Sequence, residues 1–374
     1  MKHALKKIGL SFSLLSFLFH CPLFAASSGP ALSTSKEDSA AKGYWFEASR
    51  DEILSKAKKE ASIRGLLGVD PASIKLIKEG FTKKYPFINV YFEEITGSDN
   101  SQRFLLELAA GRGADWDVIY LSVDHYNEYR PYLEKIDLLG MARQKVLNIP
   151  PAMISPQDRN AVSMGVFTDV AAYNTKMLKS NEIPATWEDF LKPGLKGKKF
   201  VTDIKPSGLA GLVPAKGMEW VLGYARRLAS QDPIWARGQT RVLTAMTTGE
   251  YALTLSTYYS TVMRARQKGA LDIEPIFLEP VPVRLGEPHA ILKGAKRPYT
   301  ALLLLEYMAG PEGQKIIDDT DPAKASVFAP GSMVEKVIAG RKLSVFDWEY
   351  FAKRGEYSSE IFKTLGFPKA DRGK

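Results

Sequence analysis

A pair of tyrosines, Tyr258 and Tyr259, is the part of this sequence best suited to binding chemistry. Apolar residues alternate with smaller ones from Gly249 to Thr257, which predicts a strand, and helical spacing up to Lys268 predicts a helix. At such a strand-to-helix turn, both phenol groups can reach one cavity. Two phenolates are hard ligands that suit a strongly charged cation such as Fe(III), which must lower their pKa from about 10. The competing interpretation is an amphipathic pair that merely starts a helix.

The chain begins with the features of an export signal. A basic start precedes an uncharged run from Ile8 to Phe19, which is too short to span a bilayer, and cleavage is expected after Ala25. We therefore predict a signal peptide over 1–25 and a mature protein in the periplasm. Residues 26–43 are rich in Ser, Ala and Thr, which predicts a flexible tether.

Composition narrows the functional classes. The only cysteine, Cys21, lies in the predicted signal peptide, so the mature chain has no thiol chemistry and no disulfide. The formal net charge of +9 suits an anionic or shielded-metal ligand, although solubility alone also explains it. We expect no nucleic-acid partner, because the basic residues are spread along the chain. The length is sufficient for two lobes of ordinary domain size.

Three strand and helix pairs follow the predicted tether. They are predicted at 62–69 with 73–84, at 88–95 with 99–110, and at 117–121 with 123–129. This β-α-β-α-β-α order implies a parallel sheet with crossover helices. The strand-to-helix turns then meet at one edge of the sheet and form the first wall of a cleft. Asp70 and Ser122 lie in two of these turns and are candidate ligand-binding residues.

The pattern changes between 133 and 160, where it becomes irregular. Two strands, at 161–167 and 170–173, are predicted to cross into a second lobe. There, turns at Ser207, Gln239 and Tyr258 form the second wall of the cleft. The predicted divisions are 44–165 for the first part of lobe 1, 166–278 for lobe 2, 279–340 for the return to lobe 1, and 341–374 for a C-terminal helical tail.

Several short motifs carry a family resemblance. In chain order they are Phe81–Pro86, Ala109–Val118, Ala172–Lys176, Thr186–Leu191, Gly249–Glu250, Tyr258–Tyr259 and Gly310–Lys315. As a set they resemble a periplasmic solute-binding protein of a bacterial ABC importer, and the chain is most similar to the ferric-iron-binding branch.

The resemblance implies an α/β fold with two lobes that close over a ligand and perform no chemistry. It assigns metal binding to Tyr258 and Tyr259, with Fe(III) as the transported ligand and not a resident cofactor. It also places a carbonate or phosphate anion near the tyrosines. The residues expected to bind that anion or line the site are Ser207, Gly208, Arg237, Gln239, Ser256 and Thr257. The implied partner is a permease in the inner membrane, and a monomer is expected.

The first-lobe metal ligands of the ferric branch do not carry over. The branch often has a histidine in the first turn and a glutamate after the third strand, where this chain has Asp70 and Ser122. Asp124 and His125 are the nearest further substitutes. Related binders of thiamine, polyamines, phosphonates and sugar phosphates share the scaffold, so an organic ligand stays open. A secreted enzyme is the alternative from another class, disfavoured because no cysteine nucleophile or Gly-x-Ser-x-Gly motif is present.

Overall fold

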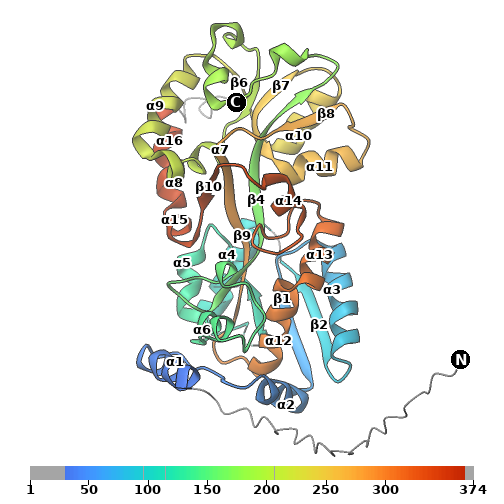
Figure 1. The fold of residues 1–374 in the computed structure, drawn as a ribbon, viewed down its shortest axis with the longest axis vertical. Helices are drawn as coiled ribbons and strands as arrows, with labels where there is room; N and C mark the ends of the chain where they lie inside the picture. The colour runs from blue at the N-terminus through green and yellow to red at the C-terminus, as the bar shows by residue number, and fades with distance from the viewer. Residues whose placement is uncertain (1–29, 96, 114, 206, 367–374) are drawn as a thin grey trace, which may run out of the picture.

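The structure, a computed structural model, describes residues 30–95, 97–113, 115–205 and 207–366. Two α/β lobes lie one above the other along the long axis, and two long strands run between them (Figure 1). The predicted fold class, two α/β lobes joined by crossing strands, is confirmed. The predicted signal peptide and residues 26–29 of the predicted tether lie outside the described residues.

The lower lobe in Figure 1 is built on three parallel strands, β1 (Ser62–Leu67), β2 (Asn89–Glu94) and β3 (Val118–Tyr120). The crossovers are α3 (Pro71–Lys84) and α4 (Ser98–Ala109), in the order that the sequence predicts. Helix α3 begins at Pro71 because the Asp70 carboxylate accepts a hydrogen bond from the Ala72 backbone N–H (2.8 Å), and proline suits the first helical position.

Two crossing strands join the lobes, β4 (Ala161–Asn174) and β9 (Val281–Ile291). They pair antiparallel in the lower lobe, and β4 continues upward to pair with strands of the upper lobe. The prediction of two strands at 161–167 and 170–173 is wrong, because β4 is continuous. Thr168 and Asp169, which resemble a polar break in the sequence, are buried inside the ladder.

The upper lobe has a mixed sheet with β7 next to β4. Its strands are β5 (Val201–Asp203), β6 (Ile234–Ala236), β7 (Leu253–Tyr258) and β8 (Ile273–Ile276). Its helices are α7 (Ser207–Ala210), α8 (Val213–Lys216), α9 (Met218–Ala229), α10 (Gln239–Thr247) and α11 (Tyr259–Gln267). Strand β7 pairs antiparallel with β4 and parallel with β5, so the strand carrying Tyr258 is central.

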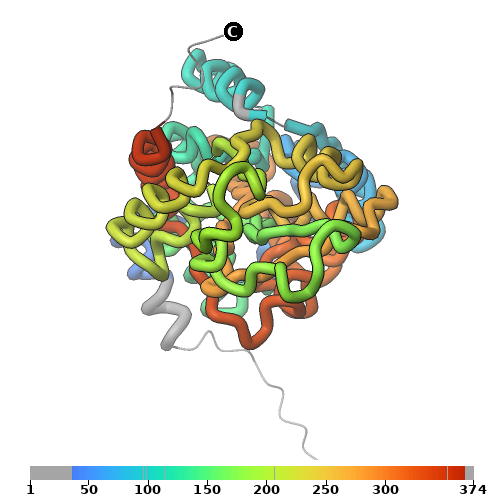
Figure 2. The backbone as a smooth tube through the Cα atoms, turned by 90° about the horizontal axis from the view of Figure 1, so that it is seen from above, coloured from blue at the N-terminus to red at the C-terminus, as the bar shows by residue number. Residues whose placement is uncertain are grey.

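After β9 the chain returns to the lower lobe and then rises again. The returning helices are α12 (Pro298–Ala309), α13 (Pro311–Thr320) and α14 (Met333–Ile338), followed by β10 (Leu343–Phe346), α15 (Trp348–Ala352) and α16 (Arg354–Thr364). The prediction of a wholly helical tail from 341 is wrong, because β10 pairs with β9. Figure 2 shows the red C-terminal helices at one side of the molecule, near α9 of the upper lobe.

The predicted tether is helical from Pro30, where α1 (Pro30–Ala41) begins. Ser39 is buried and donates a hydrogen bond to the Asp137 carboxylate (2.5 Å), and Trp45 forms a backbone bridge with Ile136. These contacts attach the segment from Pro30 to the lower lobe, although its composition alone predicts a flexible tether.

Shorter helical segments complete the fold, namely α2 (Arg50–Glu60), α5 (Tyr126–Tyr129), α6 (Leu138–Arg143), and 3-10 turns at Arg130–Tyr132, Pro151–Met153, Ser180–Glu182, Trp187–Leu191 and Pro193–Leu195. Helix α12 is the centre of the lower core, because its residues Leu302 to Leu305 are all fully buried. Over the residues that the structure describes, no helix combines the length and apolar character needed to cross a membrane.

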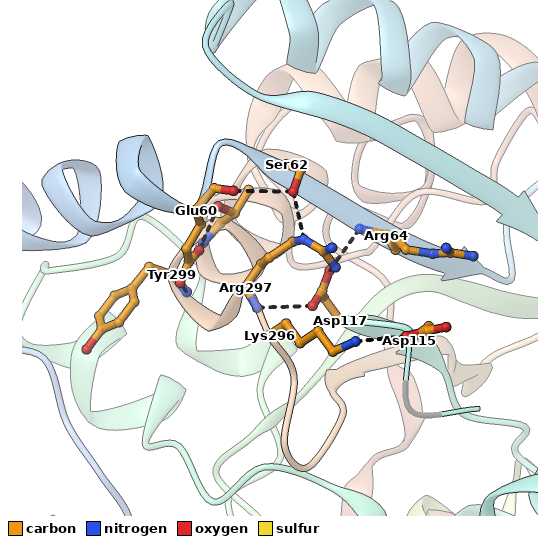
Figure 3. A network of polar contacts seen from close by, with 9 residues as sticks. Glu60, Ser62, Arg64, Asp115, Asp117, Lys296, Arg297 and Tyr299 are labelled. Atoms are coloured by element: carbon orange, nitrogen blue, oxygen red, sulfur yellow. Dashed lines mark hydrogen bonds and ion pairs between the residues drawn. The ribbon is translucent and has the colours of Figure 1, made fainter. Parts of the chain in front are cut away.

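A polar network holds the lower lobe at the sheet edge opposite the cleft (Figure 3). The buried Asp117 carboxylate accepts hydrogen bonds from the backbone N–H groups of Arg64 (2.9 Å) and Arg297 (3.1 Å). It also pairs with the Arg297 guanidinium (3.0 Å), which in turn donates to the Ser62 hydroxyl (2.7 Å). One carboxylate therefore links β1, the start of β3 and the start of α12.

Replacing Asp117 by alanine should lower the free energy of unfolding by about 3–5 kcal/mol, because it leaves the Arg297 guanidinium without its carboxylate. The matched control is Asp115→Ala, which removes an exposed pair with Lys296 (3.0 Å) and should leave the free energy of unfolding close to that of the parent. Urea denaturation of both variants measures the difference. Equal losses would show that the Asp117 network does not stabilise the lobe.

Candidate functional site

The two tyrosines lie at the predicted strand-to-helix junction but have different neighbours. Tyr258 is the last residue of β7, and its ring lies 4.9 Å from the ring of Phe167. Tyr259 begins α11, is only 6% exposed, and packs its ring edge-on against Phe277 at 5.0 Å. Burial raises the pKa of the Tyr259 phenol. The structure therefore does not gather the two phenol oxygens around one set of neighbours.

Both tyrosines do lie at the start of the helix. Tyr258 is the last residue of β7, opposite Asp169 of β4, and is also the N-cap of α11, while Tyr259 is the first residue of that helix. Their rings nevertheless pack against different neighbours, Phe167 for Tyr258 and Phe277 for Tyr259.

The residues predicted for the second wall do come together around Tyr258. The Gln239 side-chain oxygen accepts hydrogen bonds from the backbone N–H of Tyr258 (2.8 Å) and the hydroxyl of Thr257 (3.4 Å). The Ser256 hydroxyl donates to the Asp169 carboxylate (3.2 Å).

Ser207 and Gly208 begin the short helix α7, and Gly208 lies so close to Ser256 that a side chain there would clash with its hydroxyl. Arg237 lies in the turn between β6 and α10, two residues before Gln239.

The residues predicted for the first wall lie on the facing lobe, where each has a structural contact. Asp70 is the N-cap of α3, and Ser122 is buried and accepts a hydrogen bond from the backbone N–H of Asp124 (3.3 Å). Asp124 forms an ion pair with Arg354 (2.7 Å). His125 precedes α5 at the N-cap position. A cavity of about 200 Å³ beside Asp70 is lined further by Glu94, Glu287, Asp321 and Lys324.

Sequence reasoning missed the residue that stands out most in the structure, Arg284 of β9. Arg284 lies directly opposite Phe167 of β4, only 6% exposed, with its guanidinium 4.2 Å from the centre of the Phe167 ring. Its Nη2 donates a hydrogen bond to the Tyr258 hydroxyl (3.1 Å). Its Nε and Nη1 are buried and have no hydrogen-bond partner among the described residues. A charged residue in the otherwise apolar run 281–285 was the available signal.

The charge of Arg284 is also uncompensated within the described residues. No carboxylate of this part of the chain lies within ion-pair distance of it, whereas Lys324, whose ammonium covers the Phe167 ring at 3.3 Å, pairs with Glu287 (2.8 Å). The buried Asp169 lies nearby, but burial raises its pKa to about 7, an effect that the Arg284 charge only partly offsets. Burying an unpaired guanidinium costs several kcal/mol, so this position favours an incoming anion.

The sequence matches the family model of the bacterial extracellular solute-binding proteins over residues 67–315, from the end of β1 into α13. A comparison with curated protein sequences gives no match.

Solved structures share the fold. The Trichodesmium protein IdiA or FutA, in complex with iron and citrate, gives a TM-score of 0.62 at 19% identity, covering 82% of this chain and 98% of that chain. Iron-bound HitA from Pseudomonas aeruginosa gives 0.60 at 16% identity, over 82% and 100%. Ferric iron-binding protein A from Mannheimia haemolytica, in an open conformation, gives 0.65 at 17% identity, over 82% and 98%.

The chain, with its two lobes joined by crossing strands, belongs to the bacterial extracellular solute-binding proteins. A fold neighbour from Agrobacterium tumefaciens, with a TM-score of 0.57 at 17% identity, is described as the substrate-binding protein of an ABC transporter.

The raised pKa of Asp169 predicts a pH-dependent stability. The unfolded carboxyl ionises near its ordinary value of 3.8, and the folded one near 7, so the folded state binds the extra proton between these values. The stability that this proton supplies is present at low pH and is lost as the pH rises to about 7.

We expect Asp169→Asn, which keeps an oxygen for the Ser256 hydroxyl, to raise the free energy of unfolding above pH 7 by up to about 4 kcal/mol. The gain should shrink steadily as the pH falls toward 4. Chemical denaturation of parent and variant at a series of pH values measures it. A difference that is the same at pH 5 and pH 8 would contradict the assignment.

Proposed function

We propose that this protein is the periplasmic substrate-binding component of an ABC import system and that its cargo is a small organic anion. The observation that carries the proposal is Arg284, a buried guanidinium with two unpartnered N–H groups and no ion-pair partner among the described residues. An anion bound there supplies the missing acceptors and compensates the charge, which makes the interaction strong.

The surroundings of Arg284 support cargo binding between the lobes. It lies on a crossing strand, beside Tyr258 of the upper lobe and Phe167 of β4. The lobes also touch through the ion pair of Arg264 in α11 with Asp321 after α13 (2.7 Å). A solute that touches both walls stabilises the closed arrangement, because only differential contact shifts such an equilibrium.

Closure of the lobes over the cargo also explains how the cargo is delivered to the permease. A permease in the inner membrane distinguishes a loaded from an empty binding protein by the relative position of its lobes, so the cargo signals its presence through the contacts it makes. This role needs no catalytic group, and a monomer with one cleft is sufficient for it.

Ferric iron with a synergistic anion is the second candidate, supported by the iron-binding neighbours and by Tyr258. Two contacts weigh against a site built on both tyrosines. The Arg284 guanidinium already donates to the Tyr258 oxygen, and its positive charge repels a metal cation there. Tyr259 packs against Phe277 in the core. An iron site would therefore combine Tyr258 with an anion held by Arg284.

The first test removes the proposed anchor. Native mass spectrometry of the periplasmic protein should show a retained organic anion, and Arg284→Ala should lose it, since truncating one partner of a buried charge pair costs about 2–5 kcal/mol, roughly 30-fold or more in affinity. The matched control is Arg227→Ala, which removes an exposed cation paired with Glu188 (3.1 Å) and should retain the mass. Retention of the anion by Arg284→Ala would place the cargo elsewhere.

The tyrosines give a second test, in the form of paired phenylalanine variants. Tyr258→Phe removes one hydroxyl beside the anion and should weaken its binding by about 1 kcal/mol, roughly fivefold. Tyr259→Phe should leave binding within twofold, because that ring packs in the core. Calorimetric titration with the anion identified above measures both. Losses of a hundredfold from both variants would instead indicate two phenolate ligands and a metal.

Iron is tested directly by titration with Fe(III) in buffer stripped of phosphate, carbonate and citrate, followed by the same titration with each anion restored. If iron is the cargo, an anion should be required, and a visible phenolate absorption band should appear. Binding should weaken at acidic pH, because protons compete with the metal for the phenolate and the anion. Absence of the band under every condition would exclude the iron candidate.

A further inference from the structure

One ion pair between the lobes joins two segments that also carry site residues. Helix α11 of the upper lobe begins directly after Tyr258, and Arg264 lies within it. The Arg264 Nη1 lies 2.7 Å from the carboxylate of Asp321, the C-cap residue of α13 in the lower lobe. Lys324 follows three residues later, with its ammonium over the Phe167 ring at 3.3 Å. The ion pair therefore fixes α11 against the lower-lobe segment that contacts Phe167.

The ion pair connects the facing walls of the two lobes at one side of the crossing strands. Figure 1 shows α11 and α13 at the right of β4 and β9, one above the other. Asp321 lines the cavity of about 200 Å³ beside Asp70, whereas Arg264 lines a groove of about 400 Å³ between α10 and α11. A contact of 2.7 Å between the two walls persists only while the lobes are close, so opening of the lobes must break it.

The surroundings of Asp321 make the loss of Arg264 unfavourable. The Asp321 side chain is only 13% exposed. Three further carboxylates line the cavity beside it, those of Asp70, Glu94 and Glu287. Lys324 is the only cation among the described residues that line this cavity, and it is already paired with Glu287 (2.8 Å). A carboxylate among like charges is stabilised by a cation from outside the cavity, and Arg264 supplies that cation from the other lobe.

Arg264 is the half of the pair that water reaches. Its side chain is 42% exposed, and its Nη2 donates a longer hydrogen bond to the Thr261 hydroxyl (3.4 Å) within the same helix. A half-exposed guanidinium returns to water at little cost when it leaves its partner, so the pair can break and re-form. Its attraction is also open to screening by salt, as that of a fully buried pair is not.

We propose that Arg264 and Asp321 form a latch that holds the two lobes closed and sets how readily they open. The latch favours the closed arrangement whether or not cargo is bound, so cargo has to supply less of the free energy of closure. It also slows release, because the lobes must part before a solute between them can leave. The inference concerns the relative position of the lobes and does not depend on the chemical class of the cargo.

The experiment measures the distance between the lobes by pulsed electron paramagnetic resonance. Spin labels are attached at Lys78→Cys on α3 and Arg241→Cys on α10, two exposed positions in different lobes. No other cysteine is expected in the mature chain, because Cys21 lies in the predicted signal peptide. The sample is the full mature chain, freed of retained solute by unfolding and refolding. Circular dichroism and thermal melts establish that each variant is folded.

Arg264→Ala and Asp321→Asn should each populate a longer distance between the labels. The ratio of closed to open molecules should fall about threefold to tenfold in either variant, because one ion pair between the lobes is lost. The double variant should lower the ratio no further than either single one, since the same pair is removed only once. The matched control is Arg266→Ala on the same helix, which removes a pair with Glu274 inside the upper lobe (2.6 Å) and should leave the ratio unchanged.

Salt provides a test that needs no change in the latch. Raising the NaCl concentration from about 0.01 M to about 1 M shortens the Debye length from about 30 Å to about 3 Å. The ratio of closed to open molecules should then fall in the parent chain and stay nearly constant in Arg264→Ala, which has no latch to screen.

Three results would overturn the inference. Equal distance distributions in the parent and both single variants would show that the pair does not hold the lobes together. An equal shift in Arg266→Ala would assign the effect to loosening of α11. Additive shifts in the double variant would show that the two residues act independently. None of these results bears on the proposed anionic cargo, which Arg284→Ala tests separately.

Discussion

The register of the crossing strands is the constraint on which the site depends. Phe167 lies opposite Arg284, Asp169 lies opposite Tyr258, and Phe346 lies opposite Arg284 on its other side. A slip of one residue in any of these ladders would turn the side chains to the other face of the sheet. The chemistry of the cleft is therefore set by backbone pairing between segments that are more than 60 residues apart in the sequence.

The site contains buried polar groups that destabilise the folded chain, and the packing of the two lobes offsets this cost. The buried Arg284 guanidinium, with its unpartnered N–H groups, destabilises the folded chain. Asp169 adds to this cost, because burial disfavours its ionised form and raises its pKa to about 7. Both groups lie where strands of the two lobes meet, flanked by cores that are fully apolar, such as the leucine helix α12. Departures of this kind from ordinary packing rules are characteristic of binding sites, because the ligand completes what the chain leaves unsatisfied.

Local patterns were sufficient to predict the order of the lower-lobe elements and the junction that carries Tyr258. They were also sufficient to bring Gln239, Ser256 and Thr257 to the same wall. The neighbours of each tyrosine ring could not be predicted, because Phe167 and Phe277 come from other segments of the chain.

Arg284 was missed for a different reason. Its charge in an otherwise apolar run was the one local signal, and the proline-containing stretch around it resembles a connection. Arg284 becomes central only through the pairing of β9 with β4.

The placement of β9 has a consequence for the order in which the lobes can form. The lower sheet is completed by β9, which lies between β3 and β4 in the sheet but follows β3 by 160 residues in the chain. The core of the lower lobe also needs α12, which follows β9. The upper strands, from β4 to β8, form one nearly contiguous stretch. A chain that emerges with its N-terminus first can therefore assemble most of the upper lobe while the lower one is still an open, three-stranded fragment. Strands β1 to β3 of the lower lobe are synthesised first but cannot complete their sheet until β9 has been synthesised. During that interval the unpaired edge of β3 is the surface most exposed to pairing with other chains.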